Sequence, residues 1–204
     1  WGGKYNNDYS LRDTLFTDLG VFENFKPSIK AEDCTSPLIF LGNIQPDLQL
    51  QVARLTGGAE HVVSDTMNLW IDLFPEMLND VLGVSTIFLI NHEEASQFTG
   101  ESNIARAGKK LLASGPEIVI VKRGAKGSYL VDQNNEFFIP AFPIERVVDP
   151  TGAGDSFAGG LMGYLSQANE SNILEGVFMG SAMASFCVEG FGLESLLKVT
   201  PEML

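Results

Sequence analysis

The most informative stretch of this sequence runs from Val147 to Gly160 and reads VVDPTGAGDSFAGG. Gly152 and Gly154 flank the small residue Ala153, and apolar residues at helical spacing follow them. This pattern is typical of a glycine-rich turn that leads into a helix. The first N–H groups of a helix lack partners within it, and the macrodipole adds roughly half a positive charge there. Because small residues allow close approach, the turn predicts a pocket for an anion.

Asp155 directly follows this turn. A carboxylate in the first turn of a helix can simply interact with the macrodipole. However, a carboxylate beside an anion pocket opposes the purpose of that pocket, unless it is a base for a hydroxyl group. Asp155 would then accept the hydroxyl proton while backbone N–H groups stabilise charge on a transferred phosphoryl group. The residues alone leave both interpretations open.

Other glycine motifs fit the sequence less well. A dinucleotide fingerprint needs a third glycine where this chain has Phe157, and no acidic ribose ligand follows at the required spacing. The Walker loop and the protein-kinase signatures are absent.

Short apolar segments alternate with helical patterns from Pro37 onward, which predicts a parallel sheet covered on both faces. Active sites in such sheets lie at the carboxyl ends of the strands. The expected strands are Leu38–Leu41, His61–Ser64, Thr86–Ile90, Ile118–Lys122, Ser128–Val131 and Phe137–Phe142. The expected helices are Pro46–Leu55, Leu69–Leu82, Glu93–Phe98, Ile104–Ser114, Ala153–Gln167 and Asn172–Glu189. Residues 1–36 show a rough apolar alternation, which predicts short strands, and then a polar connector.

Composition narrows the class of protein. With 204 residues, of which 45% are hydrophobic, the chain can bury a core, and its apolar runs are too short to span a bilayer. A net charge of −13 argues against binding to nucleic acid or to an anionic membrane surface. The two cysteines, Cys34 and Cys187, are expected to be reduced thiols of a cytoplasmic protein.

The run from Asp149 to Gly160 resembles the C-terminal signature of the PfkB, or ribokinase-like, family of carbohydrate and nucleoside kinases. Two further segments, 91–94 (NHEE) and 122–128 (KRGAKGS), resemble the N-x-x-E element and the nucleotide turn of that family. The resemblance implies a three-layer α/β/α fold with a mostly parallel central sheet. Residues 37–204 would form the nucleotide-binding core, and residues 1–36 a partial β lid and connector. The family's early Gly-Gly substrate motif is not in this sequence, so we expect the chain to be truncated at its N-terminus.

The activity implied by the resemblance is ATP-dependent transfer of the γ-phosphoryl group to an alcohol group of a sugar or nucleoside. Asp155 would be the catalytic base, and the backbone of Gly152, Ala153 and Gly154 would form the anion hole. The resemblance further implies a cytoplasmic enzyme that forms a homodimer through the lid.

The resemblance also implies cofactor ligands. Asn91 and Glu94 would hold Mg²⁺ through water, since Mg²⁺ keeps several waters and few protein oxygens. The alternative is a plain helix start, with Asn91 as the cap and Glu94 in the capping box.

The nucleotide would contact Lys122, Gly124 and Gly127, although the family often has a hydroxyl residue in place of Lys122. The alternative is a turn with solvated cations. Asp149 and Thr151 would bind a monovalent cation such as K⁺, and a structural turn explains them equally well.

Two other functions compete with a kinase. A non-catalytic nucleotide-binding protein of the same fold would bind ATP without a phosphate acceptor, and a dehydrogenase would bind NAD. Separate titrations of ATP and NAD distinguish the three.

Overall fold

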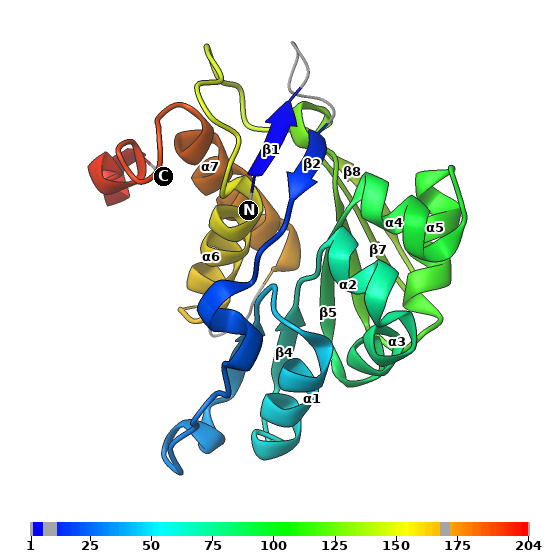
Figure 1. Ribbon diagram of the computed structural model, residues 1–204. Coiled ribbons are helices and arrows are strands. Elements are labelled where there is room, and N and C mark those ends of the chain that lie inside the picture. Colours follow the sequence, from blue (N-terminus) through cyan, green and yellow to red (C-terminus); the bar gives the residue numbers. More distant parts are fainter. Residues whose placement is uncertain (1, 6–11, 168–171, 204) are drawn as a thin grey trace.

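A six-stranded sheet, in the order β3-β4-β5-β6-β7-β8, runs through the protein (Figure 1). The computed structural model describes residues 2–5, 12–167 and 172–203. The strands are β3 (Leu38–Leu41), β4 (His61–Ser64), β5 (Ile87–Asn91), β6 (Ile118–Lys122), β7 (Ser128–Asp132) and β8 (Glu136–Ile139). Strands β3 to β6 are parallel, and β7 and β8 are antiparallel to their neighbours. The prediction of a mostly parallel sheet is confirmed.

Helices cover both faces of this sheet (Figure 1). One face packs against α1 (Pro46–Leu55), α2 (Asn68–Leu73), α3 (Pro75–Val84), α4 (His92–Thr99) and α5 (Ile104–Leu112). The other face packs against α6 (Ala153–Leu165) and α7 (Ile173–Val188). The three-layer arrangement is therefore confirmed. Within the described ranges, no helix has the length and apolar character needed to cross a membrane.

Strand β5 shows why the sheet has two apolar faces. Phe88 and Ile90 belong to the core beneath α2 to α5, whereas Leu89 belongs to the core beneath α6 and α7. All three side chains are fully buried. Since successive side chains of a strand point to opposite faces, a strand buried on both sides has a continuous apolar sequence.

Two prolines change elements that were expected to be longer. The predicted helix Leu69–Leu82 is two helices, because Pro75 cannot donate a backbone hydrogen bond and instead starts α3. The predicted strand Phe137–Phe142 starts one residue earlier and ends at Ile139, because Pro140 has no N–H group to pair with β7.

The N-terminal part forms a separate antiparallel pair of strands, β1 (Gly2–Tyr5) and β2 (Arg12–Phe16). Short 3₁₀ helices follow at Gly20–Asn24 and Asp33–Thr35. The apolar alternation thus correctly predicts short strands in this region. Trp1 and residues 6–11, which belong to the expected lid, lie outside the described residues.

Two glycines bring α6 and α7 into close contact. A Cβ atom at Gly160 would lie 2.7 Å from the carbonyl oxygen of Met179, and one at Gly180 would lie 2.7 Å from the carbonyl oxygen of Phe157. A methyl group has no room at either position, so the helix that carries the glycine-rich turn is fixed by backbone-to-backbone packing.

We expect Gly180→Ala to destabilise the protein by about 1–3 kcal/mol, because the new methyl group overlaps the backbone of α6. Urea unfolding measures this change. Gly163→Ala is the matched control: it also lies in a helix, but nothing lies within 4 Å of its added Cβ. That substitution should stabilise the protein by about 0.5–1 kcal/mol. Equal effects of the two variants would contradict the close contact.

Candidate active site at the carboxyl ends of the parallel strands

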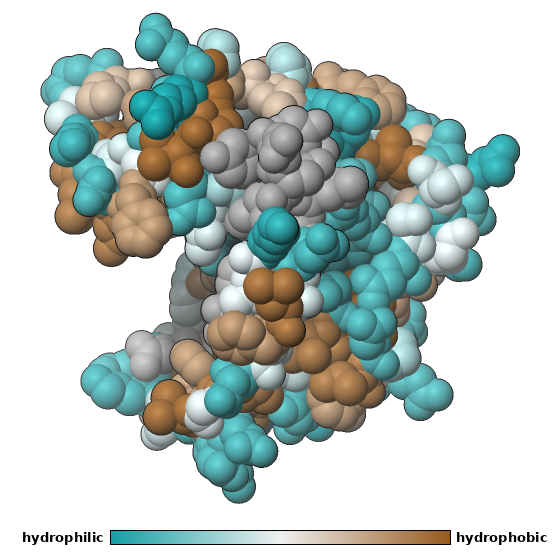
Figure 2. Space-filling view, turned by 45° about the horizontal axis from the view of Figure 1, so that its top comes forward, coloured by the Kyte–Doolittle hydropathy of each residue, from teal (hydrophilic) through white to brown (hydrophobic). Residues whose placement is uncertain are grey.

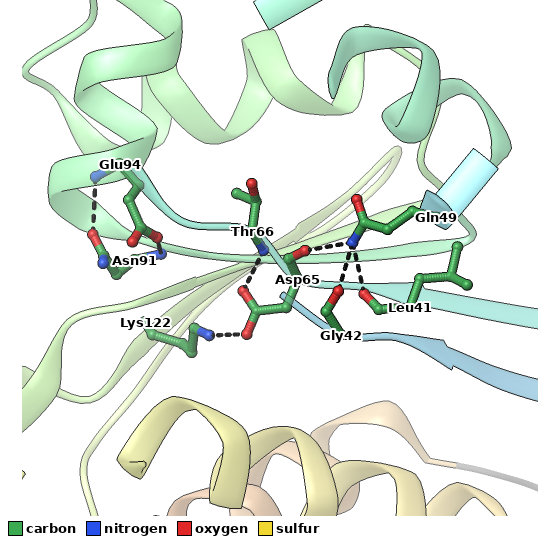
Figure 3. Close-up of polar contacts among 8 residues, drawn as sticks. All are labelled: Leu41, Gly42, Gln49, Asp65, Thr66, Asn91, Glu94 and Lys122. Carbon is green, nitrogen blue, oxygen red and sulfur yellow. Dashed lines mark hydrogen bonds and ion pairs between the residues drawn. The ribbon is translucent and has the colours of Figure 1, made fainter. Parts of the chain in front are cut away.

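Polar side chains from three adjacent strands lie at one edge of the sheet, and one of them, Lys122, reaches the start of α6. Asp65 directly follows β4, Asn91 ends β5, and Lys122 ends β6, where it pairs in register with Asn91. These strands are parallel, so their carboxyl ends lie at one edge of the sheet, where ligands bind in such folds. Figure 3 shows Asp65 and Lys122 pointing toward each other, above the helix that carries the glycine-rich turn.

The glycine-rich turn has the conformation that its sequence predicts. Gly152 caps α6 with φ +83°, a left-handed conformation that favours glycine. The N–H of Ala153 donates to the carbonyl oxygen of Pro150 at 3.2 Å. Among the described residues, the N–H groups of Gly152, Gly154 and Asp155 have no hydrogen-bond partner. The open donors are therefore those of Gly152, Gly154 and Asp155, whereas the sequence pointed to Gly152, Ala153 and Gly154.

Asp155 is exposed in the first turn of α6. Within the part of the chain that the structure describes, its side chain forms no hydrogen bond or ion pair. Its charge nevertheless reaches Asp65, whose pKa it helps to raise. The carboxylate thus stands open to a ligand beside unpaired N–H groups, as a base for an incoming hydroxyl group requires.

Lys122 has a partner that the sequence did not reveal. Its Nζ lies 2.5 Å from Oδ2 of Asp65, and the two side chains are 16% and 6% exposed. Burial raises the pKa of Asp65, and the ammonium group of Lys122 opposes that rise. A Cβ atom at Gly154 would lie 3.3 Å from Nζ, so the ammonium group stands at the start of α6. The only sequence signal for Asp65 was an acidic residue directly after a predicted strand.

Asn91 and Glu94 form the capping box that was the structural alternative for them. Oδ1 of Asn91 accepts from the N–H groups of Glu93 and Glu94 at 2.9 Å, and Oε2 of Glu94 accepts from the N–H of Asn91 at 3.1 Å. Glu94 is 6% exposed. The same residues border a cleft of about 270 Å³, whose lining does not include Asp155, Lys122 or the glycine-rich turn.

This cleft lies between β2 and the starts of α2 and α4. Its lining is formed by carboxylate, amide and hydroxyl side chains: Asp13, Thr14, Asn68, Asn91, Glu93, Glu94 and Gln97. Oxygen donors of this kind suit Mg²⁺. Within the described ranges, no three His, Cys, Asp or Glu side chains are grouped closely enough to hold a metal ion by themselves. Any Mg²⁺ here would retain most of its water ligands.

The predicted nucleotide turn depends on its glycines. Gly124 starts a 3₁₀ helix (Gly124–Lys126) with φ +55°, and Gly127 ends it with φ +78° and ψ −139°. A Cβ atom at Gly127 would lie 1.9 Å from the carbonyl oxygen of Ile139. The turn is therefore pressed against the end of β8, and only glycine fits at position 127.

The segment before the glycine-rich turn packs on the end of α7. The N–H groups of Val148 and Asp149 donate to the carbonyl oxygen of Val188 at 2.7 and 3.3 Å. Oδ1 of Asp149 accepts from the N–H of Thr151 at 2.9 Å, and the thiol of Cys187 donates to the carbonyl oxygen of Thr151 at 3.4 Å. Asp149 and Thr151 thus lie beside the end of α7. Both cysteines are free thiols, as expected.

Comparison with known proteins identifies the family. A family model described as pfkB family carbohydrate kinase matches residues 48–199, well over half of the chain. The chain belongs to this family. The matched range contains the cap of α4, the nucleotide turn and the glycine-rich turn of α6, so the pfkB assignment rests on the segments that form the site.

Several pfkB relatives have named activities. Aminoimidazole riboside kinase of Salmonella typhimurium is 33% identical over 135 residues, which are 65% of this chain and 42% of that protein. A nucleoside kinase of Methanocaldococcus jannaschii is 26% identical over 179 residues, 87% of this chain and 57% of that protein. The chain therefore spans about half the length of these relatives.

Solved structures of the family share the fold. The crystal structure of aminoimidazole riboside kinase from Salmonella enterica, complexed with aminoimidazole riboside and an ATP analogue, has a TM-score of 0.71 at 26% identity. The match covers 84% of this chain and 64% of that one. Ribokinase from Thermotoga maritima has a TM-score of 0.71 at 27% identity, covering 86% and 58% of the two chains.

Proposed function

We propose that this chain carries the nucleotide-binding and catalytic part of an ATP-dependent kinase. The enzyme transfers the γ-phosphoryl group of ATP to an alcohol group of a sugar or nucleoside. One observation carries this proposal: the carboxylate of Asp155 stands beside N–H groups at the start of α6 that have no partner among the described residues, with the Lys122 ammonium group next to Gly154. A base and an anion cradle side by side are what phosphoryl transfer to an alcohol requires.

Each group has a defined task in the proposed reaction. The carboxylate of Asp155 accepts the proton of the attacking hydroxyl group. The N–H groups of Gly152, Gly154 and Asp155 donate to the oxygens of the migrating phosphoryl group. The ammonium group of Lys122 supplies positive charge at the same place. Because these donors are fixed by the helix, they stabilise the transition state without reorganising. The turn at Gly124 and Gly127 provides backbone that approaches the nucleotide closely.

Mg²⁺ is the cofactor that fits the oxygen-lined cleft. Asn91 and Glu94 would hold it through water, and the bound ion neutralises phosphate charge. We also propose a K⁺ ion near Asp149 and Thr151, since the carboxylate and backbone oxygens of this turn lie beside the end of α7.

We expect Glu94→Gln to raise the Mg²⁺ concentration needed for half-maximal activity by about tenfold, because a water-bridging carboxylate is lost. Direct Mg²⁺ titration by calorimetry provides a second readout. Glutamine still completes a capping box, so the protein should lose no more than about 1 kcal/mol of stability. Glu93→Gln is the control, because it removes a neighbouring carboxylate of the same cleft. If Glu93→Gln raises the required Mg²⁺ concentration more than Glu94→Gln does, the proposed role of Glu94 is wrong.

The strands β1 and β2 form part of a lid over the acceptor. This proposal is supported by Asp13 and Thr14 of β2, which line the cleft. The segment also bears exposed apolar side chains at Leu15, Phe16, Val21, Phe22 and Phe25. Figure 2 shows apolar patches that interrupt an otherwise polar face. Since apolar clusters of this kind mark interaction surfaces, we propose a homodimer through this segment.

A screen of acceptors tests the proposed function. Ribose, fructose, 2-keto-3-deoxygluconate and adenosine are incubated with the protein, ATP and Mg²⁺, and ADP release is measured. We expect ADP release with at least one of these acceptors and saturable ATP binding in their absence. If calorimetry detects no ATP binding, the proposal is wrong; if it detects binding but no acceptor supports turnover, the chain is a nucleotide-binding protein only.

A further inference from the structure

The ammonium group of Lys122 lies where an unsupported cation is unfavourable. It stands at the start of α6, with Nζ 3.3 Å from the position of a Cβ atom on Gly154. The macrodipole makes this end of the helix positive, which repels a cation. Anions near this end of the helix offset the repulsion: the carboxylate of Asp155 stands in the first turn of α6, and one further anion contacts the ammonium group directly.

Asp65 is that anion, and its backbone is fixed. Oδ2 lies 2.5 Å from Nζ of Lys122, and Oδ1 accepts from the N–H of Thr66 at 2.9 Å. The N–H of Asp65 donates to the carbonyl oxygen of Leu41 at 3.0 Å. Its carbonyl oxygen accepts from Nε2 of Gln49, a side chain only 1% exposed, at 2.9 Å. Figure 3 shows the carboxylate bonded to Lys122 and to the N–H of Thr66, and the backbone carbonyl of Asp65 bonded to Gln49. The backbone of Asp65 is thus fixed, and Lys122 is the cation that its carboxylate contacts among the described residues.

We infer that Asp65 is a positioning residue, which holds the ammonium group of Lys122 at the start of α6 so that it contacts the phosphates of the nucleotide. The inference rests on the proposed function and deepens it. An ammonium group has three N–H donors, so a bond to Asp65 leaves two for phosphate oxygens. The pair also neutralises Asp65, which would otherwise repel the phosphates together with the nearby Asp155.

Asp65 could instead compete with the phosphates for Lys122, and the two roles predict opposite couplings. If Asp65 positions Lys122, then Lys122 contributes more to nucleotide affinity when Asp65 is present. If Asp65 competes with the phosphates, Lys122 contributes less when Asp65 is present. Binding of the ATP analogue AMP-PNP, measured by calorimetry with Mg²⁺ present, separates them in a double-mutant cycle of Lys122→Met and Asp65→Asn. Asparagine keeps an oxygen acceptor for the N–H of Thr66 and nearly the same shape.

We expect Lys122→Met to weaken AMP-PNP binding by about 10- to 100-fold when Asp65 is present, and by less than about threefold in the Asp65→Asn background. Lys109 and Glu136 provide the matched control cycle. Their ion pair also has an N–O distance of 2.5 Å, but it joins α5 to β8 and its side chains are 59% and 39% exposed. Lys109→Met and Glu136→Gln should leave AMP-PNP affinity unchanged.

A second readout follows Lys122 directly and needs no nucleotide. A partly buried ammonium group that is bonded to a carboxylate exchanges its protons more slowly than a free one, which makes its ¹⁵N NMR signal easier to observe. We expect Asp65→Asn to weaken or remove that signal. Asp65→Glu keeps the charge but moves the carboxylate by one methylene, so it should shift the signal. This variant replaces Asp65→Asn if Asp65→Asn does not fold.

An equal or larger effect of Lys122→Met on AMP-PNP binding in the Asp65→Asn background would overturn the inference, as would an ammonium signal unchanged in both Asp65 variants. Failure of the wild-type chain to bind AMP-PNP would refute the proposed function, and the ammonium signal would then decide the role of Asp65 alone.

Discussion

Asp155→Asn is expected to lower the turnover of phosphoryl transfer by about 10²- to 10⁴-fold, the usual contribution of a general base. Asparagine has the same size and leaves the N–H donors of α6 in place, but it cannot accept the hydroxyl proton. ATP binding should be retained or become tighter, because a negative charge beside the phosphates is removed. The measurement is turnover with the acceptor found in the screen, together with ATP affinity by calorimetry.

Glu175→Gln is the matched control for Asp155→Asn. Glu175 also occupies the first turn of a helix, α7, where it accepts a hydrogen bond from the hydroxyl group of Tyr164 at 2.5 Å. Removing a carboxylate from a helix start costs only about 0.3–1 kcal/mol of stability, so both variants should fold. Turnover of Asp155→Asn within about tenfold of wild type would remove Asp155 from its proposed role. A loss of ATP binding in that variant would indicate a structural role instead.

Gly127→Ala is expected to destabilise the protein by more than about 3 kcal/mol, a large part of the usual 5–15 kcal/mol. The added methyl group would lie 1.9 Å from the carbonyl oxygen of Ile139 and 2.8 Å from the backbone nitrogen of Ala141. Both are backbone atoms, one in the last residue of β8 and one just after that strand, so they cannot move aside as a flexible side chain can. The combination of φ +78° and ψ −139° adds strain for any residue with a Cβ atom.

Urea unfolding of Gly127→Ala is compared with that of Gly124→Ala. Gly124 also has a positive φ, +55°, but nothing lies within 4 Å of its added Cβ. Gly124→Ala should therefore cost only about 1 kcal/mol, which is the conformational penalty alone. Equal losses in the two variants would show that the contact with Ile139 contributes nothing.

Local patterns predicted the parts of this protein that local physics determines. Apolar runs such as Ile118–Lys122 are strands with unchanged bounds, and the glycine-rich turn starts a helix at Ala153 as its spacing indicated. The break at Pro75 and the strand end at Pro140 follow from proline chemistry, but the apolar pattern continued across both and hid them.

Contacts between residues far apart in the chain could not be predicted from the sequence. The partner of Lys122 is Asp65, 57 positions earlier, and nothing in either local pattern indicates the pair. Asn91 and Glu94 illustrate a different limit: the spacing of a capping box is also the spacing of two oxygen donors. The structure places both residues in the box and at the edge of the cleft, so the two interpretations are compatible.

The close contact between α6 and α7 has a consequence for how activity can be lost. Gly160 lies five residues beyond Asp155, which is about 7–8 Å along the helix axis. A bulky residue at Gly160 or Gly180 would tilt α6 and displace the N–H groups that we propose bind the migrating phosphoryl group. Random mutagenesis should therefore yield inactive but folded variants with substitutions at the contact between α6 and α7. Second substitutions that shorten a side chain on the opposite helix of this contact should restore turnover.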